Sequence, residues 1–180
     1  MKPNLSLSIN HAKECLDYHP ETGVLLWKVR PQAHFSTEKR WKIWNTRYAG
    51  KAAGTPAHNG YLQIVLKPKF FLAHRLAWFL FHDRWPAFHI DHINGIKNDN
   101  RIINLREATH SENCMNTPKK KSNTSGSKGV FWHKAANKWG AGIGLDGKNI
   151  NLGLFNTIEE AANSVRSARE QYHSSFANHG

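Results

Sequence analysis

The sequence is poor in cysteine, in acidic residues and in long apolar runs. Its two cysteines, Cys15 and Cys114, lie far apart and form no C-x-x-C pair, so we expect neither a disulfide framework nor a cysteine-type zinc site. The twelve histidines are scattered without ligand spacing, which gives a structural zinc protein little support. No apolar run has the length of a membrane span, and the N-terminal residues lack the apolar core of a signal peptide. We therefore expect a cytosolic protein with reduced thiols.

The shortage of acidic residues leaves a strong positive charge. The chain has thirteen Asp and Glu but twenty-five Lys and Arg, which gives a formal net charge of +12 over 180 residues. Such a charge predicts a polyanionic partner, because neutralising phosphates releases their counterions and so drives binding. An anionic membrane surface is the rival partner, but no long basic amphipathic helix favours it. A solvated basic surface without a partner is the third interpretation, and nucleic acid is the one we prefer.

The first ninety residues predict short elements of mixed type. In chain order these are a helix within 5–17, a tight turn over 18–23, a strand over 24–28, a loop with at most a short helical piece over 30–54, strands at 61–66 and 70–71 joined by a turn at 67–69, and a helix from 72 to the proline at 86.

The next segment predicts a compact ββα unit. Strands are expected at 88–92 and 103–108, with a polar loop between them. Thr109 and Glu112 then match a capping box, in which each side chain bonds the other residue's backbone amide. A helix should therefore begin at Thr109 and end before Pro118.

Asp91 and His92 are the candidate reactive pair of this unit. Phosphodiester hydrolysis needs a base for water and a cation to steady the developing charge. His92 suits the first task because imidazole titrates near neutral pH. Asp91 suits the second as a hard oxygen ligand for Mg²⁺ or a similar ion. Neighbours on a strand point to opposite sides, and the turn at Asn94 and Gly95 provides the bend that convergence requires.

Two amides complete the candidate site. Asn104, at the start of the returning strand, is placed to fix the tautomer of the His92 ring. Asn113, about one turn inside the capped helix, is placed to reach the metal from the side opposite Asp91. Taken singly, each has a simpler interpretation: an Asp–His surface turn, an Asn104 that caps backbone amides, an Asn113 that faces solvent. Their order on one ββα framework favours the site.

Together these motifs resemble those of HNH endonucleases, specifically the phage homing type. The resemblance covers roughly residues 18–116 and rests on the following segments: Pro20-Glu21-Thr22-Gly23, Trp27, His74-Arg75-Leu76, Asp91-His92-Ile93-Asn94-Gly95, Asp99-Asn100-Arg101, Asn104-Leu105-Arg106 and Asn113.

The resemblance implies a role for each residue of the site. It implies a ββα-metal fold with His92 as general base, Asn104 as the residue that orients it, and Asp91 and Asn113 as metal ligands. Because Asn113 stands where many of these enzymes have a final histidine, one Mg²⁺ or Mn²⁺ bound through oxygens is implied over tightly held zinc. His110 competes with Asn113 for the ligand role, and nicking and double-strand cutting both remain open. The triplet at His74 is expected to pack against the core.

The C-terminal third predicts a second small domain behind a basic linker. Residues 118–126 have the composition of a flexible tether, and Lys119, Lys120 and Lys121 either touch phosphates or are simply solvated. Three strand-like segments follow, with a hairpin signal at Asp146-Gly147. A second capping box, at Thr157 and Glu160, begins a helix.

This domain resembles the plant ethylene-response-factor (apetala-two) DNA-binding domain over residues 125–177. In that family a three-stranded sheet lies in the major groove with a helix behind it, which implies base contacts by Lys128 and His133 and phosphate contacts by Lys134, Lys138 and Lys148. The sequence departs from the family's usual contact residues at Phe131, Gly142, Gly144 and Asn151. Looser or different specificity is therefore expected, and a domain that only supports its neighbour is the alternative.

These expectations define an α+β protein. Residues 1–117 form a ββα-metal (His-Me finger) nuclease domain with a motif core at 70–117 and a β-rich extension at 18–66, residues 118–126 the linker, and residues 127–180 the apetala-two-like domain. We expect a monomeric, metal-dependent homing-type endonuclease that acts on double-stranded DNA, without membrane contact, in the cytoplasm of a bacterial or phage-infected cell. The alternative is a DNA-binding regulator whose nuclease framework is inactive.

Overall fold

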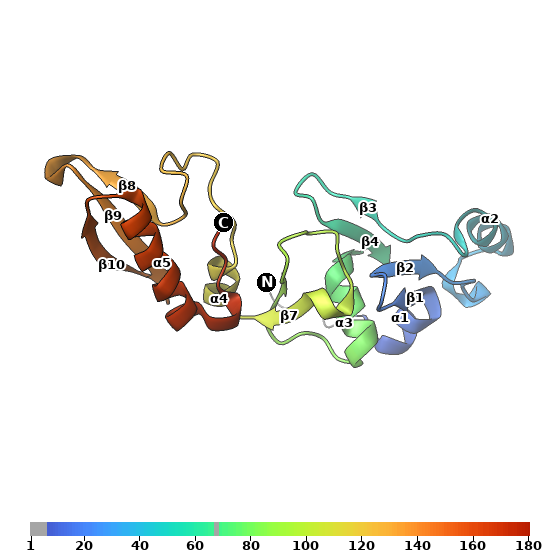
Figure 1. The fold of residues 1–180 in the computed structure, drawn as a ribbon. Coiled ribbons are helices and arrows are strands. Elements are labelled where there is room, and N and C mark those ends of the chain that lie inside the picture. Colours follow the sequence, from blue (N-terminus) through green and yellow to red (C-terminus); the bar gives the residue numbers. More distant parts are fainter. Residues whose placement is uncertain (1–6, 67–68) are drawn as a thin grey trace. The chain divides into compact units, whose positions relative to one another are not determined.

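The chain is divided into two compact units in the computed structural model, which describes residues 7–66 and 69–180. The first unit spans Met1–Glu107 and the second spans Ala108–Gly180 (Figure 1). The division falls ten residues before the boundary expected from the sequence, which was placed after residue 117. Helix α4, at His110–Met115, is thereby assigned to the second unit.

The described residues of the first unit form three small sheets and three α-helices. Its elements are α1 (Ile9–Cys15), β1 (Leu16–His19), β2 (Val24–Trp27), the 3-10 helix η1 (Gln32–His34), α2 (Glu38–Tyr48), β3 (Thr55–Pro56), β4 (Leu62–Leu66), β5 (Lys69–Leu72), α3 (Ala73–His82), β6 (His89–His92), η2 (Ile102–Asn104) and β7 (Leu105–Ala108). Strands β1 and β2 form an antiparallel hairpin, β3-β4-β5 an antiparallel sheet, and β6 pairs with β7.

Helix α3 forms the centre of the first core. Its residues Leu76 and Ala77 are completely buried, and they share one apolar cluster with Leu16 of β1 and with Ile64 and Leu66 of β4. Burying apolar surface is the main driving force for such packing. The cluster therefore holds the N-terminal elements and the helix that precedes the ββ segment as one body.

Most of the expected elements of this unit are confirmed, with several differences. Tyr18 and His19 of the expected turn lie in β1, and residues 103–104 of the expected returning strand belong to η2. Helix α1 ends at Cys15, and Asp17 lies in β1 instead; the expected start of this helix at residue 5 and the turn at 67–68 lie outside the described residues. A loop with at most a short helical piece was expected over 30–54, but residues Glu38–Tyr48 form the eleven-residue helix α2. No residue of α2 is fully buried, but Trp41, Trp44 and Tyr48 form a partly buried aromatic stripe at helical spacing. This spacing was the available signal for the helix.

The second unit combines α4 with a three-stranded sheet and a long helix. Its elements are α4, β8 (Val130–His133), the 3-10 helix η3 (Lys134–Ala136), β9 (Lys138–Leu145), β10 (Lys148–Phe155), α5 (Ile158–His173) and the 3-10 helix η4 (Ser174–Phe176). The antiparallel sheet has the order β10-β9-β8. Both capping boxes are formed, at Thr109 with Glu112 and at Thr157 with Glu160.

Helix α5 covers one face of this sheet. Ala161 and Val165 of the helix pack against Val130 of β8 and against Ala141 and Ile143 of β9, and all five are buried. The expected arrangement of three strands and one helix is therefore confirmed. In the part of the chain that the structure describes, no helix is long and apolar enough to cross a membrane.

Candidate active site

Strand β6 places Asp91 and His92 side by side in the interior of the first unit. Asp91 is only 5% exposed and His92 only 4%. The chain turns directly after them, since the amide of Gly95 donates to the carbonyl of His92 at 2.8 Å and Gly95 has a φ of 72°. A positive φ is readily adopted by glycine, which has no Cβ. The expected bend after the pair is therefore present.

The carboxylate of Asp91 is held by Arg106 from strand β7. The guanidinium Nε lies 2.9 Å and Nη2 lies 2.8 Å from the same oxygen, Oδ2. Both side chains are largely buried, at 6% and 16% exposure. A buried carboxylate requires such a partner, because removal from water penalises an uncompensated charge. Arg106 thus compensates the buried charge of Asp91 and fixes the position of its carboxylate.

The ring of His92 is contacted by Asn100, which the sequence analysis assigned to the motif but gave no role. Nε2 of His92 lies 3.2 Å from Oδ1 of Asn100, and Asn100 is 1% exposed. Burial lowers the pKa of His92 below its usual 6.5, although the Asn100 bond and the carboxylates of Asp91 and Asp99 oppose this shift. The imidazole is consequently neutral at neutral pH, which is the form that accepts a proton.

Two further rings enclose His92. The His74 ring stands edge-on to it with centroids 5.0 Å apart, and the Tyr61 ring lies 5.0 Å from His74 and 5.9 Å from His92. His74 is buried, and burial together with His92 and Arg75 lowers its pKa to about 3. His74 was expected to pack against the core, and the structure places it against the candidate base itself.

Asn104 fixes the loop that follows the reactive pair. Its Oδ1 accepts from the amide of Asn94 at 3.0 Å, and its Nδ2 donates to the carbonyl of Asp99 at 2.8 Å. The backbone of Asn104 also accepts from Ile93 at 2.9 Å. These bonds tie the two ends of the loop together, whereas the sequence analysis assigned Asn104 directly to the His92 ring. The ring contact described above comes from Asn100 in the same loop.

The β1–β2 hairpin also contacts this loop. The hydroxyl of Tyr18 donates to the carbonyl of Asn100 at 2.7 Å, and the amide of Ile102 donates to the carbonyl of Pro20 at 3.0 Å. Gly23 has a φ of 74°, and a Cβ there would lie 2.5 Å from the backbone nitrogen of Arg101. The hairpin and the loop therefore approach as closely as only glycine permits.

The two candidates for the last metal ligand both lie on α4 of the second unit. His110 is the first residue of the helix and exposed, and Asn113 follows three positions later and is partly exposed. The ring Nε2 of His110 lies 3.7 Å from Sγ of Cys114. The first unit thus brings together Asp91, His92 and Asn104 of the predicted set, and the choice between Asn113 and His110 stays a prediction.

Comparison with known proteins places these observations in a family. The family model described as HNH endonuclease matches residues 71–115, from strand β5 to the last residue of α4. Protein 3.8 of Escherichia phage T7 is 38% identical over 91 residues, which are 51% of this chain and 74% of that protein. The chain belongs to the family of T7 protein 3.8 and carries an HNH endonuclease domain. No solved structure matches it.

The HNH segment contains most, but not all, of the site. Asp91, His92, Asn100 and Arg106 lie inside residues 71–115, whereas Tyr61 and the β1–β2 hairpin lie outside. Sequence reasoning missed Arg106 as the partner of Asp91. The pair joins strands β6 and β7, so no local spacing in the sequence pointed to it.

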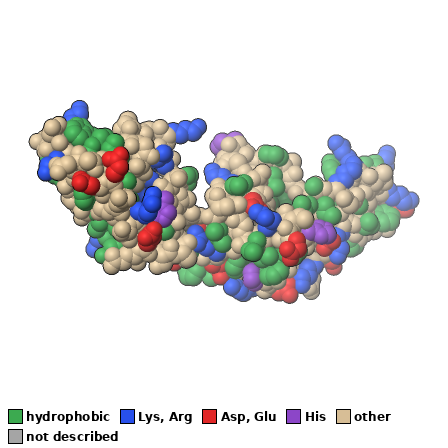
Figure 2. Space-filling view, in the orientation of Figure 1, with side chains coloured by type: hydrophobic (Ala, Val, Ile, Leu, Met, Phe, Trp, Pro, Cys, Tyr) green, Lys and Arg blue, Asp and Glu red, His purple; other side chains and the backbone are tan. Residues whose placement is uncertain are grey.

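The basic residues expected to contact DNA lie in the second unit, and most are on its surface. Lys and Arg side chains are spread over the drawn face of both units, interspersed with Asp and Glu (Figure 2). The following are exposed: Lys119, Lys120, Lys121, His133, Lys134, Lys138 and Lys148. Of these, Lys119, Lys120 and Lys148 line one hollow of ≈ 880 Å³ together with Arg169 and His173.

Lys128 has a different task from the expected DNA contact. Its Nζ donates to the carbonyls of Met115 at 3.1 Å, Thr117 at 2.5 Å and Asn178 at 2.9 Å. Burial, reinforced by Arg169, lowers the pKa of this lysine to about 8. An ammonium group has three donors, and all are engaged. Lys128 therefore secures the end of α4, and we do not retain it as a DNA contact.

Proposed function

We propose that this protein is a metal-dependent DNA endonuclease of the phage homing type, in which His92 is the general base. The observation that carries the proposal is the neutral, buried imidazole beside a buried carboxylate, inside the segment that matches HNH endonucleases. A neutral imidazole held by Asn100 accepts a proton from water attacking a phosphodiester. Asn104 and the β1–β2 hairpin keep the loop that carries Asn100 in place.

The oxygen donors near His92 fit a hard divalent cation such as Mg²⁺ or Mn²⁺. Asp91 would hold it together with Asn113 or, in the competing assignment, His110. When bound, one such ion would stabilise negative charge on the phosphate and the leaving oxygen. Arg106 orients the carboxylate.

A plasmid assay tests the base. Supercoiled DNA is incubated with the full chain and Mg²⁺ or Mn²⁺, and conversion to open-circle or linear DNA is followed. His92→Ala should lower the cleavage rate by about a hundredfold or more, the range that a positioned base supplies. His58→Ala, an exposed histidine of the same unit, is the control and should leave the rate unchanged.

Absence of cleavage by the unmodified chain, together with retained DNA binding, would favour the alternative of a DNA-binding regulator with an inactive nuclease framework. Cleavage that survives His92→Ala would reject His92 as the base.

For the second unit we propose that it binds double-stranded DNA and places the nuclease, in a manner similar to the apetala-two domains. The open face of the sheet supports this. Gly140, Gly142 and Gly144 alternate with buried Ala141 and Ile143 on β9, so they face away from α5. At Gly142 and Gly144 the lack of a side chain permits close approach of a polynucleotide backbone. The ring of Phe131 covers Gly140, where a Cβ would lie 2.6 Å from it.

Salt dependence tests this placement role. Lys134, Lys138 and Lys148 are replaced together by alanine in the full chain, with Lys39 and Lys42 of α2 replaced in a control variant. Each phosphate contact contributes about 0.9 to the slope of log K against log salt concentration. The triple variant should therefore lose about 2 to 3 from this slope and bind more weakly. An unchanged slope would leave the second unit with only a supporting role.

A further inference from the structure

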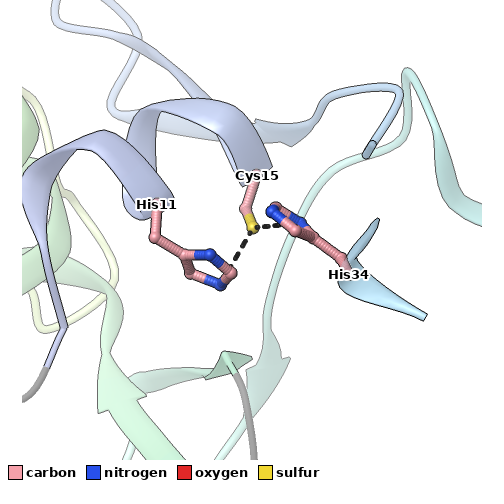
Figure 3. A group of neighbouring side chains, drawn as sticks. All are labelled: His11, Cys15 and His34. Atoms are coloured by element: carbon pink, nitrogen blue, oxygen red, sulfur yellow. Dashed lines mark hydrogen bonds between the residues drawn. The ribbon is translucent and has the colours of Figure 1, made fainter. Parts of the chain in front are cut away.

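Three potential metal ligands converge at the N-terminal end of the first unit. His11 and Cys15 are one turn apart on α1, and His34 comes from η1, nineteen residues further along (Figure 3). The thiol Sγ lies 3.6 Å from Nε2 of His11 and 3.7 Å from Nδ1 of His34. All three donor atoms lie within 4.8 Å of one another. The expectation that the histidines are scattered without ligand spacing is wrong for this group.

These separations are those of a tetrahedral site. Zinc binds histidine nitrogen at about 2.1 Å and cysteine sulfur at about 2.3 Å, so a nitrogen and a sulfur ligand at the tetrahedral angle lie about 3.5 Å apart. The two observed nitrogen–sulfur distances agree with this value. Imidazole and thiolate are also the donors that zinc prefers over the hard oxygen set proposed for Asp91.

Glu14 supports the same geometry from behind the rings. Its Oε2 lies 2.8 Å from Nε2 of His34 and 4.0 Å from Nδ1 of His11. In both histidines the nitrogen that faces Cys15 is therefore opposite the nitrogen that faces the carboxylate. A carboxylate on the outer nitrogen fixes the tautomer of a metal-bound histidine and raises its basicity.

The surroundings exclude most solvent from the three donors. Cys15 is fully buried, and the side chains of His11 and His34 are 14% and 10% exposed. A contact from Arg30 competes with a metal, since its Nε donates to Nδ1 of His34 at 3.4 Å. Arg30 also stacks over the rings of Phe35 and Trp44. These stacking contacts do not depend on its bond to His34, so that bond can be given up.

We propose that His11, Cys15 and His34 bind one Zn²⁺ ion, with water in the fourth position. Binding requires the thiol to lose its proton and replaces the sulfur–imidazole contacts by metal–ligand bonds. The ion would join α1 to η1. It would also fix the start of the β1–β2 hairpin, since the carbonyl of Cys15 accepts from the amide of Lys28 at 3.0 Å. The site does not depend on the proposed nuclease activity.

Cobalt substitution tests the proposal without any DNA assay. The purified full chain is freed of metal with a chelator and titrated with Co²⁺ in excess Mg²⁺, while thiolate-to-cobalt charge transfer and visible absorption are recorded. One equivalent of Co²⁺ should produce both signals, and Zn²⁺ should displace it. Elemental analysis of the untreated protein should find one zinc per chain more than in Cys15→Ala.

Matched variants identify the thiolate. Cys15→Ala and His34→Ala should each abolish the charge-transfer signal, whereas Cys114→Ala should retain it. Cys114 is the appropriate control because it also lies one turn from a histidine, at 3.7 Å from His110. If Cys15→Ala does not fold, as judged by circular dichroism, the partly exposed His34→Ala decides. The proposal is overturned if the unmodified chain gives no signal, or if the signal survives both substitutions or is lost with Cys114. A metal-free network of hydrogen bonds would then explain the cluster.

Discussion

Replacing Gly23 by alanine should disturb the candidate active site from outside the HNH segment. Two costs add at this position. An L residue at φ 74° costs about 1–2 kcal/mol. The new Cβ would also lie 2.5 Å from the backbone nitrogen of Arg101 and 2.6 Å from the backbone carbon of Asn100, and overpacking of this kind costs about 1–3 kcal/mol. The free energy of unfolding should therefore fall by about 2–5 kcal/mol.

Gly50 provides a matched control for the backbone term. Its φ is 76°, but an added Cβ would meet nothing within 4 Å. Gly50→Ala should therefore cost only about 1–2 kcal/mol. Urea unfolding of the two variants, followed by circular dichroism, gives the difference of about 1–3 kcal/mol that belongs to the close contact alone.

Cleavage rates should separate the two variants further. In Gly23→Ala the displaced backbone belongs to Asn100, whose side chain contacts the ring of His92. A displacement of about 1 Å in a catalytic group can cost about a hundredfold in rate. We expect a loss of ten- to a hundredfold for Gly23→Ala and none for Gly50→Ala. Equal stabilities together with equal rates would refute the claim that the hairpin holds the loop.

Three other perturbations should act on single contacts. Arg106→Ala removes the cation that pairs with the buried carboxylate of Asp91 and should lower the free energy of unfolding by about 3–5 kcal/mol. A loss below 1 kcal/mol in urea unfolding would show that the pair is dispensable. The pKa of His74 is lowered to about 3, so between pH 6.5 and 3 the unfolded chain binds a proton that the folded chain does not, and stability falls as the pH falls through this window. His74→Phe should flatten that fall, and an unaltered pH profile of stability would count against the burial of a neutral His74. Lys128→Met removes an ammonium bonded to three carbonyls and should destabilise the second unit by about 2–4 kcal/mol. The melting temperature should therefore fall, and an unchanged melting temperature would contradict this role.

The sequence predicted the elements whose signals are local. The two capping boxes depend on residues three positions apart, and both helices begin where expected. The strands of the second unit follow from short apolar runs between turn signals. Helix α2 was missed although its partly buried aromatic residues, Trp41, Trp44 and Tyr48, have helical spacing.

The contacts within the site were harder to predict because they join distant segments. The pairing of Asp91 and His92 could be seen in the motif, but Tyr61 reaches His92 only through the packing of another sheet. Asn100 and Asn104 lie in one loop, and only the folded loop shows which of the two contacts the ring. The His11, Cys15 and His34 cluster carried one local signal, the four-residue spacing on α1; its third member depends on the fold.

The contacts between the hairpin and the loop determine how short a fragment with the proposed activity can be. Tyr18 and Gly23 precede the HNH segment by about fifty residues, yet they contact its loop directly. A fragment trimmed to residues 71–115 would retain the proposed base and its carboxylate neighbour while losing the hairpin contacts that hold the loop of Asn100. Transplanting the motif alone into another protein should therefore yield an inactive copy, and the unit to transfer begins no later than strand β1.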